Sequence, residues 1–383
     1  MTSRQPVSKD ESVLIVGAGV FGLATALELK KRGYRDVVVL DRFLPPVVDG
    51  SSVDISRIIR FDYADPIYSR MAREALVEWN HEWKGSYYNS GLAMFANQSG
   101  NTYLDKTIEV HKANGTNLDQ YQDAKDFQSK HQKIPARLEG LQAVYNPNAG
   151  WADAESSIRR LSMKCTLAGV SFITGPRGTV QSLRYNGGRV VGVNVAQGEP
   201  LYASQVVLAT GAWTNRLVPM THATSASAQP VGFIQLTADE AKELEGMPVM
   251  LNFNTGLFCF PPTPETNILK IARHGYGYAT QFDVEDDTSR RTVSSPKRDS
   301  NNASSGYLPQ DADTALREGL RQLLPDFAGH EWMKRRLCWY SDTPSGDFII
   351  DYHPETKGLF FATGGAGQYV EDTTVETSTS RHY

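Results

Sequence analysis

Apolar runs and a helical pattern alternate at the start of the chain. Val13–Val16 is a short apolar run that ends in a cluster of glycines, Phe21–Lys31 has helical periodicity, and Val37–Leu40 is a second apolar run. A helix between two such runs joins strands that lie parallel. This order therefore predicts a β-α-β unit with a right-handed crossover and a parallel sheet.

Similar segments recur later in the chain, between stretches of a different pattern. Asp153–Leu167 and Ala312–Leu324 are predicted helices, and Ser51–Trp83 is predicted to begin as a polar loop and to continue as a helix. Buried strands are predicted at Val170–Thr174, Val190–Val195, Gln205–Ala209 and Gly358–Thr363. Alternation typical of antiparallel strands occurs at Pro230–Leu236, Leu257–Phe260 and Ile268–His274. Residues 84–150 show little periodicity, and Ser294–Gly306 is predicted to be an exposed loop.

This order of segments predicts an α/β (α+β) protein in which one domain interrupts another. We expect the domain with the parallel sheet to comprise residues 1–83, 151–222 and 331–372. A second domain, built on an antiparallel sheet, is expected from residues 84–150 and 223–330. Residues 373–383 are rich in Ser and Thr without an apolar face, which predicts a flexible tail.

Composition narrows the class of protein. The chain has 383 residues, 40% of them hydrophobic, and a formal net charge of −4. This balance argues against disorder and against nucleic-acid binding, which normally requires a basic face. No apolar run approaches the ~20 residues that span a bilayer. Cys165, Cys259 and Cys338 lie too far apart in sequence for a zinc site or a disulfide framework.

The glycines after the first predicted strand indicate a dinucleotide site. Gly17, Gly19 and Gly22 fit the spacing G-x-G-x-x-G, and Asp41 ends the next predicted strand. In such a motif the first two glycines allow a tight turn and close approach of a pyrophosphate, and the third lets helix and strand pack closely. An acidic residue at the position of Asp41 accepts hydrogen bonds from ribose hydroxyls. The motif alone fits NAD or FAD; its place near the N-terminus and the later strand Val206–Thr214, which ends in Ala-Thr-Gly, favour FAD.

Nine ordered segments together resemble the sarcosine-oxidase-like branch of the D-amino-acid-oxidase superfamily of FAD-dependent oxidoreductases. The resemblance is strongest to its fungal saccharopine oxidases, L-pipecolate oxidases and fructosyl amino acid oxidases. The segments are Gly17–Gly22 with Asp41, Ser56–Arg60, Trp151–Asp153, Arg177–Val180, Ala209–Trp213, Ile268–His274, Cys338–Pro344, Asp347–Asp351 and Thr363–Gly367.

The resemblance implies an FAD-binding Rossmann-like domain of the GR2 type with an interleaved substrate domain. It also implies that the flavin is bonded covalently to Cys338, which precedes an aromatic-Tyr-x-x-Thr run. Lys334–Arg336 would supply a positive environment for that thiol, or would form a solvated surface run. The implied cofactor-binding residues are Gly17, Gly19, Val20, Phe21, Gly22, Asp41, Arg42, Ser51, Ser56, Arg57, Val180, Thr210, Gly211, Trp213, Cys338, Asp342, Gly364, Gly365 and Gly367.

Four further residues match the family's catalytic and substrate positions. Lys270 matches a lysine that promotes the reaction with O2, and His274 matches a histidine beside the substrate. Arg57 matches a residue near the flavin, and Arg60 one that holds the substrate carboxylate. Arg57 and Arg60 would share a face if they lay on a helical turn. The alternatives are an outward-facing lysine, a histidine satisfied in the core or at the surface, and surface arginines paired with acids such as Asp54 or Asp62.

Taken together, these matches imply oxidation of the carbon–nitrogen bond of a small amino acid or secondary amine, giving an imine and hydrogen peroxide. Tyr276, Tyr278 and Phe61 are candidates for an aromatic pocket or for core packing. After Gly367 the chain departs from the family's His-Gly-Phe-Lys-Phe, which leaves open an inactive flavin-binding protein, and a flavin dehydrogenase is the other alternative.

We expect a monomer whose partners are the small amine or amino acid and O2, with no nucleic acid and no membrane. We also expect a cytoplasmic location, because the peroxisomal ending of the relatives is replaced by Arg381-His382-Tyr383.

Overall fold

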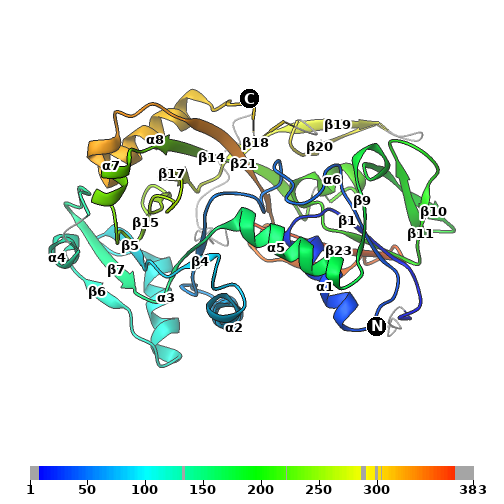
Figure 1. The fold of residues 1–383 in the computed structure, drawn as a ribbon, viewed down its shortest axis with the longest axis horizontal. Coiled ribbons are helices and arrows are strands. Elements are labelled where there is room, and N and C mark those ends of the chain that lie inside the picture. Colours follow the sequence, from blue (N-terminus) through cyan, green and yellow to red (C-terminus); the bar gives the residue numbers. More distant parts are fainter. Residues whose placement is uncertain are drawn as a thin grey trace.

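The computed structural model describes residues 8–131, 134–220, 222–285, 290–297, 301–302 and 304–366. It is a mixed α/β protein with two principal sheets, and β14 and β21 extend between the regions that these sheets occupy (Figure 1).

The first principal sheet has six strands in the order β22-β23-β13-β1-β2-β9. Its members are β1 (Val13–Val16), β2 (Val37–Leu40), β9 (Ser171–Ile173), β13 (Gln205–Leu208), β22 (Ile349–Tyr352) and β23 (Leu359–Thr363). All pairs are parallel except β22 with β23. The predicted β-α-β unit is confirmed, since α1 (Val20–Lys31) connects β1 to β2.

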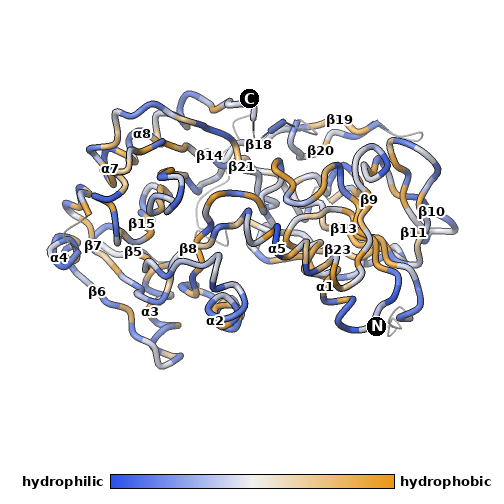
Figure 2. The backbone as a smooth tube through the Cα atoms, in the orientation of Figure 1, coloured by the Kyte–Doolittle hydropathy of each residue, from blue (hydrophilic) through white to orange (hydrophobic). Residues whose placement is uncertain are grey.

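Both faces of this sheet are covered, which explains why its strands read as continuous apolar runs. α1 and α5 (Ala154–Leu167) pack with one face. The other face packs against a small sheet of β10 (Val180–Asn186), β11 (Arg189–Val195) and β12 (Leu201–Tyr202). Apolar segments accordingly gather around β13, β23 and α1 (Figure 2).

The second principal sheet has nine strands and is largely antiparallel. Eight follow the order β18-β14-β17-β16-β15-β5-β7-β6, and β21 pairs with the free side of β14. The strands are β5 (Leu92–Asn97), β6 (Asp119–Tyr121), β7 (Leu141–Asn146), β14 (Ser225–Gln235), β15 (Val249–Asn252), β16 (Leu257–Cys259), β17 (Ile268–Arg273), β18 (Tyr278–Ala279) and β21 (Lys334–Asp342). The amphipathic helix α8 (Gln310–Leu323) buries its apolar side against this sheet.

Shorter elements join the sheets and flank them. They are α2 (Pro66–His81), α3 (Thr102–Ala113), α4 (Ala124–Lys130), α6 (Thr214–Leu217), α7 (Ala238–Glu243), the small sheet of β3 (Arg57–Ile59), β8 (Gly150–Ala152) and β4 (Tyr87–Tyr88), and the hairpin of β19 (Gln281–Glu285) and β20 (Arg290–Ser294). No helix in the described ranges combines the length and apolarity that a bilayer crossing requires.

Two expectations from the sequence are corrected here. Residues 84–150, which lack clear periodicity, contain β4 to β8, α3 and α4; β5 is buried along nearly its whole length and so does not alternate. The segment Ser294–Gly306 is not simply an exposed loop, because Ser294 ends β20 and both Ser295 and Asn302 are buried. The boundaries of the two domains stay a prediction, and the tail 373–383 lies outside the described residues.

Candidate active site

One large cavity of about 1000 Å³ lies between the two principal sheets. The six-stranded sheet contributes the loops after β1, β2 and β13, at the carboxyl ends of its parallel strands. The nine-stranded sheet contributes β14, β17 and β21. This is where open parallel sheets bind their ligands.

Glycine is required in the loop that follows β1. Gly17 has a φ of +109°, and a Cβ there would lie 2.4 Å from the carbonyl oxygen of Ala209. A Cβ at Gly22 would lie 1.9 Å from the carbonyl oxygen of Gly17, which is why this helix can pack so closely on the turn. The result is a cradle of bare backbone at the start of α1, where free N–H groups favour a phosphate.

Asp41 lies beside this cradle as predicted. Its Oδ2 accepts a hydrogen bond of 2.7 Å from the Ala18 N–H. Burial raises the pKa of Asp41, and the backbone hydrogen bond from Ala18 opposes that rise. Arg42, the next residue, also lines the cavity, and its guanidinium lies 5.3 Å from the centre of the Trp213 ring.

Most of the predicted cofactor residues line the cavity. They are Gly17, Gly19, Val20, Phe21, Asp41, Arg42, Ser51, Arg57, Val180, Thr210, Gly211, Trp213, Cys338 and Gly365. Four do not line it directly, namely Gly22, Ser56, Asp342 and Gly364, and Gly367 lies outside the described residues. Asp342 instead accepts a hydrogen bond from the Ser227 hydroxyl.

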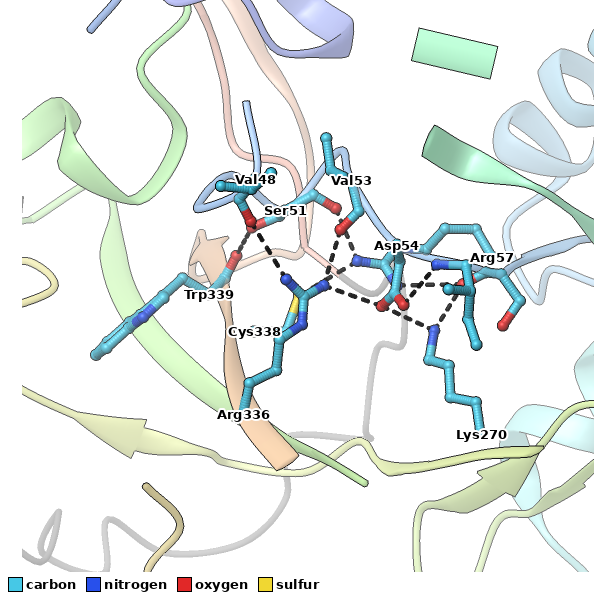
Figure 3. A network of polar contacts seen from close by, with 11 residues as sticks. Val48, Ser51, Val53, Asp54, Arg57, Lys270, Arg336, Cys338 and Trp339 are labelled. Atoms are coloured by element: carbon cyan, nitrogen blue, oxygen red, sulfur yellow. Dashed lines mark hydrogen bonds and ion pairs between the residues drawn. The ribbon is translucent and has the colours of Figure 1, made fainter. Parts of the chain in front are cut away.

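The centre of the site is a buried carboxylate surrounded by cations (Figure 3). Asp54 Oδ2 lies 2.9 Å from Lys270 Nζ and 3.1 Å from Arg336 Nη2, and it also accepts a hydrogen bond from Arg57 Nη1. Lys270 Nζ donates a second hydrogen bond, of 2.6 Å, to the carbonyl oxygen of Ser56. Lys270 therefore points inward, and the alternative of an outward-facing lysine on β17 is wrong.

Burial and charge act on this cluster in opposite directions. Burial raises the pKa of Asp54, but the charges of Lys270, Arg57 and Arg336 outweigh it and hold that pKa well below its usual range. Burial lowers the pKa of Lys270 to about 7, since the attraction of Asp54 offsets only part of the desolvation. The Lys270 side chain can therefore change between its charged ammonium form and its neutral amine form near pH 7.

Arg57 connects this cluster to Cys338. Its Nη2 donates to the carbonyl oxygen of Ser51 at 2.8 Å and to Cys338 Sγ at 3.3 Å. The basic run before Cys338 contributes only in part, because Lys334 is exposed and Arg335 pairs with Asp313 on α8. Arg57 therefore places a positive charge within hydrogen-bond distance of the thiol.

Arg57 and Arg60 do not lie on a helical turn. Arg57 begins the strand β3 and pairs with Ala152, while Arg60 follows the end of that strand. The condition for a shared helical face is therefore not met. Both guanidiniums nevertheless line the cavity.

The groups that contact the Arg60 guanidinium directly are neutral. Its Nη1 donates to the carbonyl oxygen of Asp62, its Nη2 lies 3.4 Å from the hydroxyl of Tyr103, and its Cζ lies 4.5 Å from the centre of the Tyr63 ring. No carboxylate in the described part of the chain lies within ion-pair distance of it. Such a guanidinium is well suited to a ligand carboxylate.

His274 and Tyr340 form the remaining polar wall. His274 Nδ1 lies 3.5 Å from the Tyr340 hydroxyl. Burial, with a smaller effect of Arg60, lowers the pKa of His274 to about 4, so the imidazole is neutral at pH 7. Tyr340 was not among the predicted site residues. It lies two residues after Cys338 on β21, and this spacing places both side chains on the same face of the strand.

The predicted aromatic candidates lie elsewhere. Tyr276 is exposed, Tyr278 donates to Asp311, and Phe61 stacks on His111 in the core. The aromatic residues that do line the cavity near Arg60, Lys270 and His274 are Tyr63, Phe253, Phe258, Phe260 and Tyr340.

Known proteins resemble this chain over most of its length. The sequence model of the family "FAD dependent oxidoreductase" matches residues 12–370. The L-saccharopine oxidase of Schizosaccharomyces pombe is 30% identical over 375 residues, which cover 93% of this chain and 86% of that protein. A monomeric sarcosine oxidase of a Bacillus species is 25% identical, with 93% and 88% covered. The crystal structure of a fructosyl amine:oxygen oxidoreductase (Amadoriase I) from Aspergillus fumigatus has a TM-score of 0.82 at 27% identity, with 95% of this chain and 83% of that chain covered.

The Asp54 cluster predicts a large stability effect for one substitution. Asp54→Asn leaves three cations without their buried counter-charge and should destabilise the fold by about 3–5 kcal/mol. The matched control is Asp313→Asn, which removes a half-exposed partner of Arg335 and should cost at most about 1 kcal/mol. Urea denaturation measures both.

The same cluster predicts the direction of a pH dependence. Because the pKa of Asp54 is lowered by folding, its stabilisation is complete above the pKa of an unfolded aspartate, about 3.9, and is lost as pH falls below it. The difference in unfolding free energy between wild type and Asp54→Asn should therefore shrink between pH 5 and pH 3. A difference that stays constant over this range would contradict the assignment.

Proposed function

The chain belongs to the FAD-dependent oxidoreductase family, and we propose that it oxidises the carbon–nitrogen bond of a small N-substituted amino acid or secondary amine with O2 as electron acceptor. One cavity contains both the buried Lys270 and the guanidinium of Arg60, which has no carboxylate partner among the described residues. This observation carries the proposal.

The chain has the features needed to hold FAD. The glycine cradle after β1 admits a pyrophosphate, Asp41 can accept from ribose hydroxyls, and Thr210 and Gly211 bring a second stretch of backbone to the cavity. When bound, the flavin supplies the acceptor for the substrate's hydride and passes the electrons on to O2.

Arg60 is proposed to bind and orient the substrate. Its fork of N–H donors can hold a carboxylate bidentately, and the rings of Tyr63, Phe253 and Phe258 exclude water around the rest of the molecule. His274 beside it is neutral, so its imidazole can accept a hydrogen bond from the substrate's amine. A neutral amine is the form whose lone pair can assist loss of hydride.

Lys270 is proposed to assist the reaction with O2. Electron transfer to O2 builds negative charge on oxygen, and a fixed ammonium within a dry cavity stabilises that charge. The contacts with Asp54 and the Ser56 carbonyl oxygen keep Lys270 Nζ in place, so little reorganisation is needed when the charge develops. This argues for an oxidase over a dehydrogenase.

Cys338 is proposed to carry the flavin covalently. Its thiol lines the cavity, and Cys338 Sγ accepts a hydrogen bond of 3.3 Å from the Arg57 guanidinium. Cys165 and Cys259 are buried in apolar cores, and burial raises the pKa of each thiol.

The covalent bond can be tested by acid precipitation of the purified holoprotein. The yellow colour should stay with the wild-type pellet and should move to the supernatant in Cys338→Ser. Cys165→Ser, which changes a thiol of the α1–α5 core, should keep its colour in the pellet. Colour that leaves wild-type protein on precipitation would contradict the attachment.

The proposed reaction is tested with a small set of substrates. The names of the relatives indicate the first compounds to try: L-saccharopine, sarcosine and a fructosyl amino acid, with L-pipecolate added as a cyclic secondary amine. We expect at least one to bleach the flavin anaerobically and to release hydrogen peroxide in air. Bleaching without peroxide would identify a dehydrogenase, and no bleaching by any of them would favour an inactive flavin-binding protein.

The role of Lys270 is tested by separating the two half-reactions in stopped flow. Lys270→Met should slow the oxygen step by about tenfold or more, since ~1.4 kcal/mol of lost stabilisation is a factor of ten. Reduction by substrate should change much less. In wild type the oxygen step should also slow as pH rises through about 7, because Lys270 is charged below its pKa; the variant should lose this dependence. Lys334→Met, an exposed lysine on β21, is the control.

A further inference from the structure

A fully buried carboxylate lies next to Arg60 without pairing with it. Asp62 is completely inaccessible to solvent, and Arg60 Nη1 donates to its backbone carbonyl oxygen. The Asp62 carboxylate is directed elsewhere, so the guanidinium contacts the residue without contacting its charge.

Two side chains engage the Asp62 carboxylate. Asn146 Nδ2 donates to both Oδ1 and Oδ2 at 3.0 Å, and His111 Nε2 lies 3.1 Å from Oδ1. Both partners are themselves about 1% exposed. Asn146 therefore holds both oxygens by hydrogen bonds, and the His111 ring lies at ion-pair distance from one of them without hydrogen-bond geometry.

Separate elements hold these two partners in place. Asn146 ends β7, and its Oδ1 accepts from the Asn148 N–H at 2.9 Å, which forces its NH₂ group toward Asp62. His111 lies in the last turn of α3, its Nδ1 is 3.1 Å from the Thr116 hydroxyl, and its ring stacks on Phe61 at 5.0 Å. The orientation of both groups is therefore fixed before any ligand arrives.

The same helix touches Arg60 directly. Tyr103 and His111 are eight residues apart on α3, which places them on one face two turns apart. Tyr103 meets the guanidinium and His111 meets the neighbouring carboxylate. α3 thus contacts both charged groups and lies where it can keep them apart.

Leaving a buried carboxylate and a half-buried guanidinium unpaired needs a physical reason. Opposite charges attract strongly in a low-dielectric interior, which favours pairing. The net stability that such a buried ion pair adds over apolar packing is nevertheless small. If Asp62 paired with Arg60 it would occupy the donors that the proposed function assigns to a substrate carboxylate. An internal counter-ion would then compete with every carboxylate that enters the cavity.

We propose that His111 and Asn146 sequester the Asp62 carboxylate, and so keep Arg60 without an internal counter-ion and available to a ligand carboxylate. The inference rests on the proposed role of Arg60 in binding substrate. His111 and Asn146 are positioning residues, since neither lines the cavity.

The test measures carboxylate affinity without turnover. Acetate is titrated into the holoprotein, and its Kd is read from the change in flavin absorbance. His111→Leu and, separately, Asn146→Ala should weaken acetate binding by about tenfold or more, because each frees the Asp62 carboxylate to take a charge-assisted bond from Arg60. Flavin content and thermal midpoint are measured for each variant.

A rescue experiment separates this role from general damage to the fold. Adding Asp62→Asn to His111→Leu removes the competing charge and should restore the acetate Kd to within about threefold of wild type. Asp62→Asn alone should also stay within about threefold. Thr107 lies on the same buried face of α3, and its hydroxyl donates to the Tyr103 carbonyl oxygen. Thr107→Val should leave the Kd unchanged while lowering the thermal midpoint.

The outcomes distinguish this inference from the proposed function. If Arg60→Gln does not weaken acetate binding, Arg60 does not bind carboxylates, and both proposals fall. If Arg60→Gln weakens binding but His111→Leu and Asn146→Ala do not, the sequestration is wrong and the substrate role of Arg60 stands. Weakening that Asp62→Asn does not relieve would show that His111 acts through packing alone, and would also overturn the inference.

Discussion

The Asp54 carboxylate is the interaction on which the rest of the site depends. It gathers a lysine from β17, an arginine from β21 and an arginine from β3 around one buried negative charge. None of these cations would be stable in the interior alone, since an isolated buried charge costs several kcal/mol. The carboxylate thus allows Lys270 and the Arg57 beside Cys338 to lie together at one cavity. Its short segment, Asp54 to Arg57, lies between the two principal sheets and connects the chemistry that each provides.

The local parts of this design are readable from the sequence. The β-α-β unit, Gly17 to Gly22 and Asp41 are close together in the chain, so their geometry follows from local rules of turn and strand. Lys270 was detectable because a charge interrupts an apolar strand, and the family resemblance gave it a role. Cys338 was singled out as a candidate flavin attachment site by the resemblance, from the aromatic-Tyr-x-x-Thr run that follows it.

What the sequence did not reveal depends on contacts between distant segments. Asp54 meets Lys270 and Arg336 across more than two hundred residues of chain, and no periodicity points to such a meeting. The elements within residues 84–150 were missed because β5 is buried on both faces and loses its alternation. Asp62, His111 and Asn146 come from a loop, a helix end and a strand end, so their association appears only when those elements are packed.

The arrangement of β21, β14 and β17 has a consequence for how this architecture can change. Cys338 pairs with Gln229 and Lys270 with Phe233, so the central strand β14 sets the spacing between the thiol and the lysine. A slip of one residue in either pairing would turn one of the two side chains to the opposite face of the sheet. Insertions and deletions are therefore excluded from these three strands. The loops outside these strands, and the hairpin β19–β20 beside the cavity, are free of that constraint. New cavity shapes can arise by lengthening or trimming loops while the distance between Cys338 and Lys270 is kept.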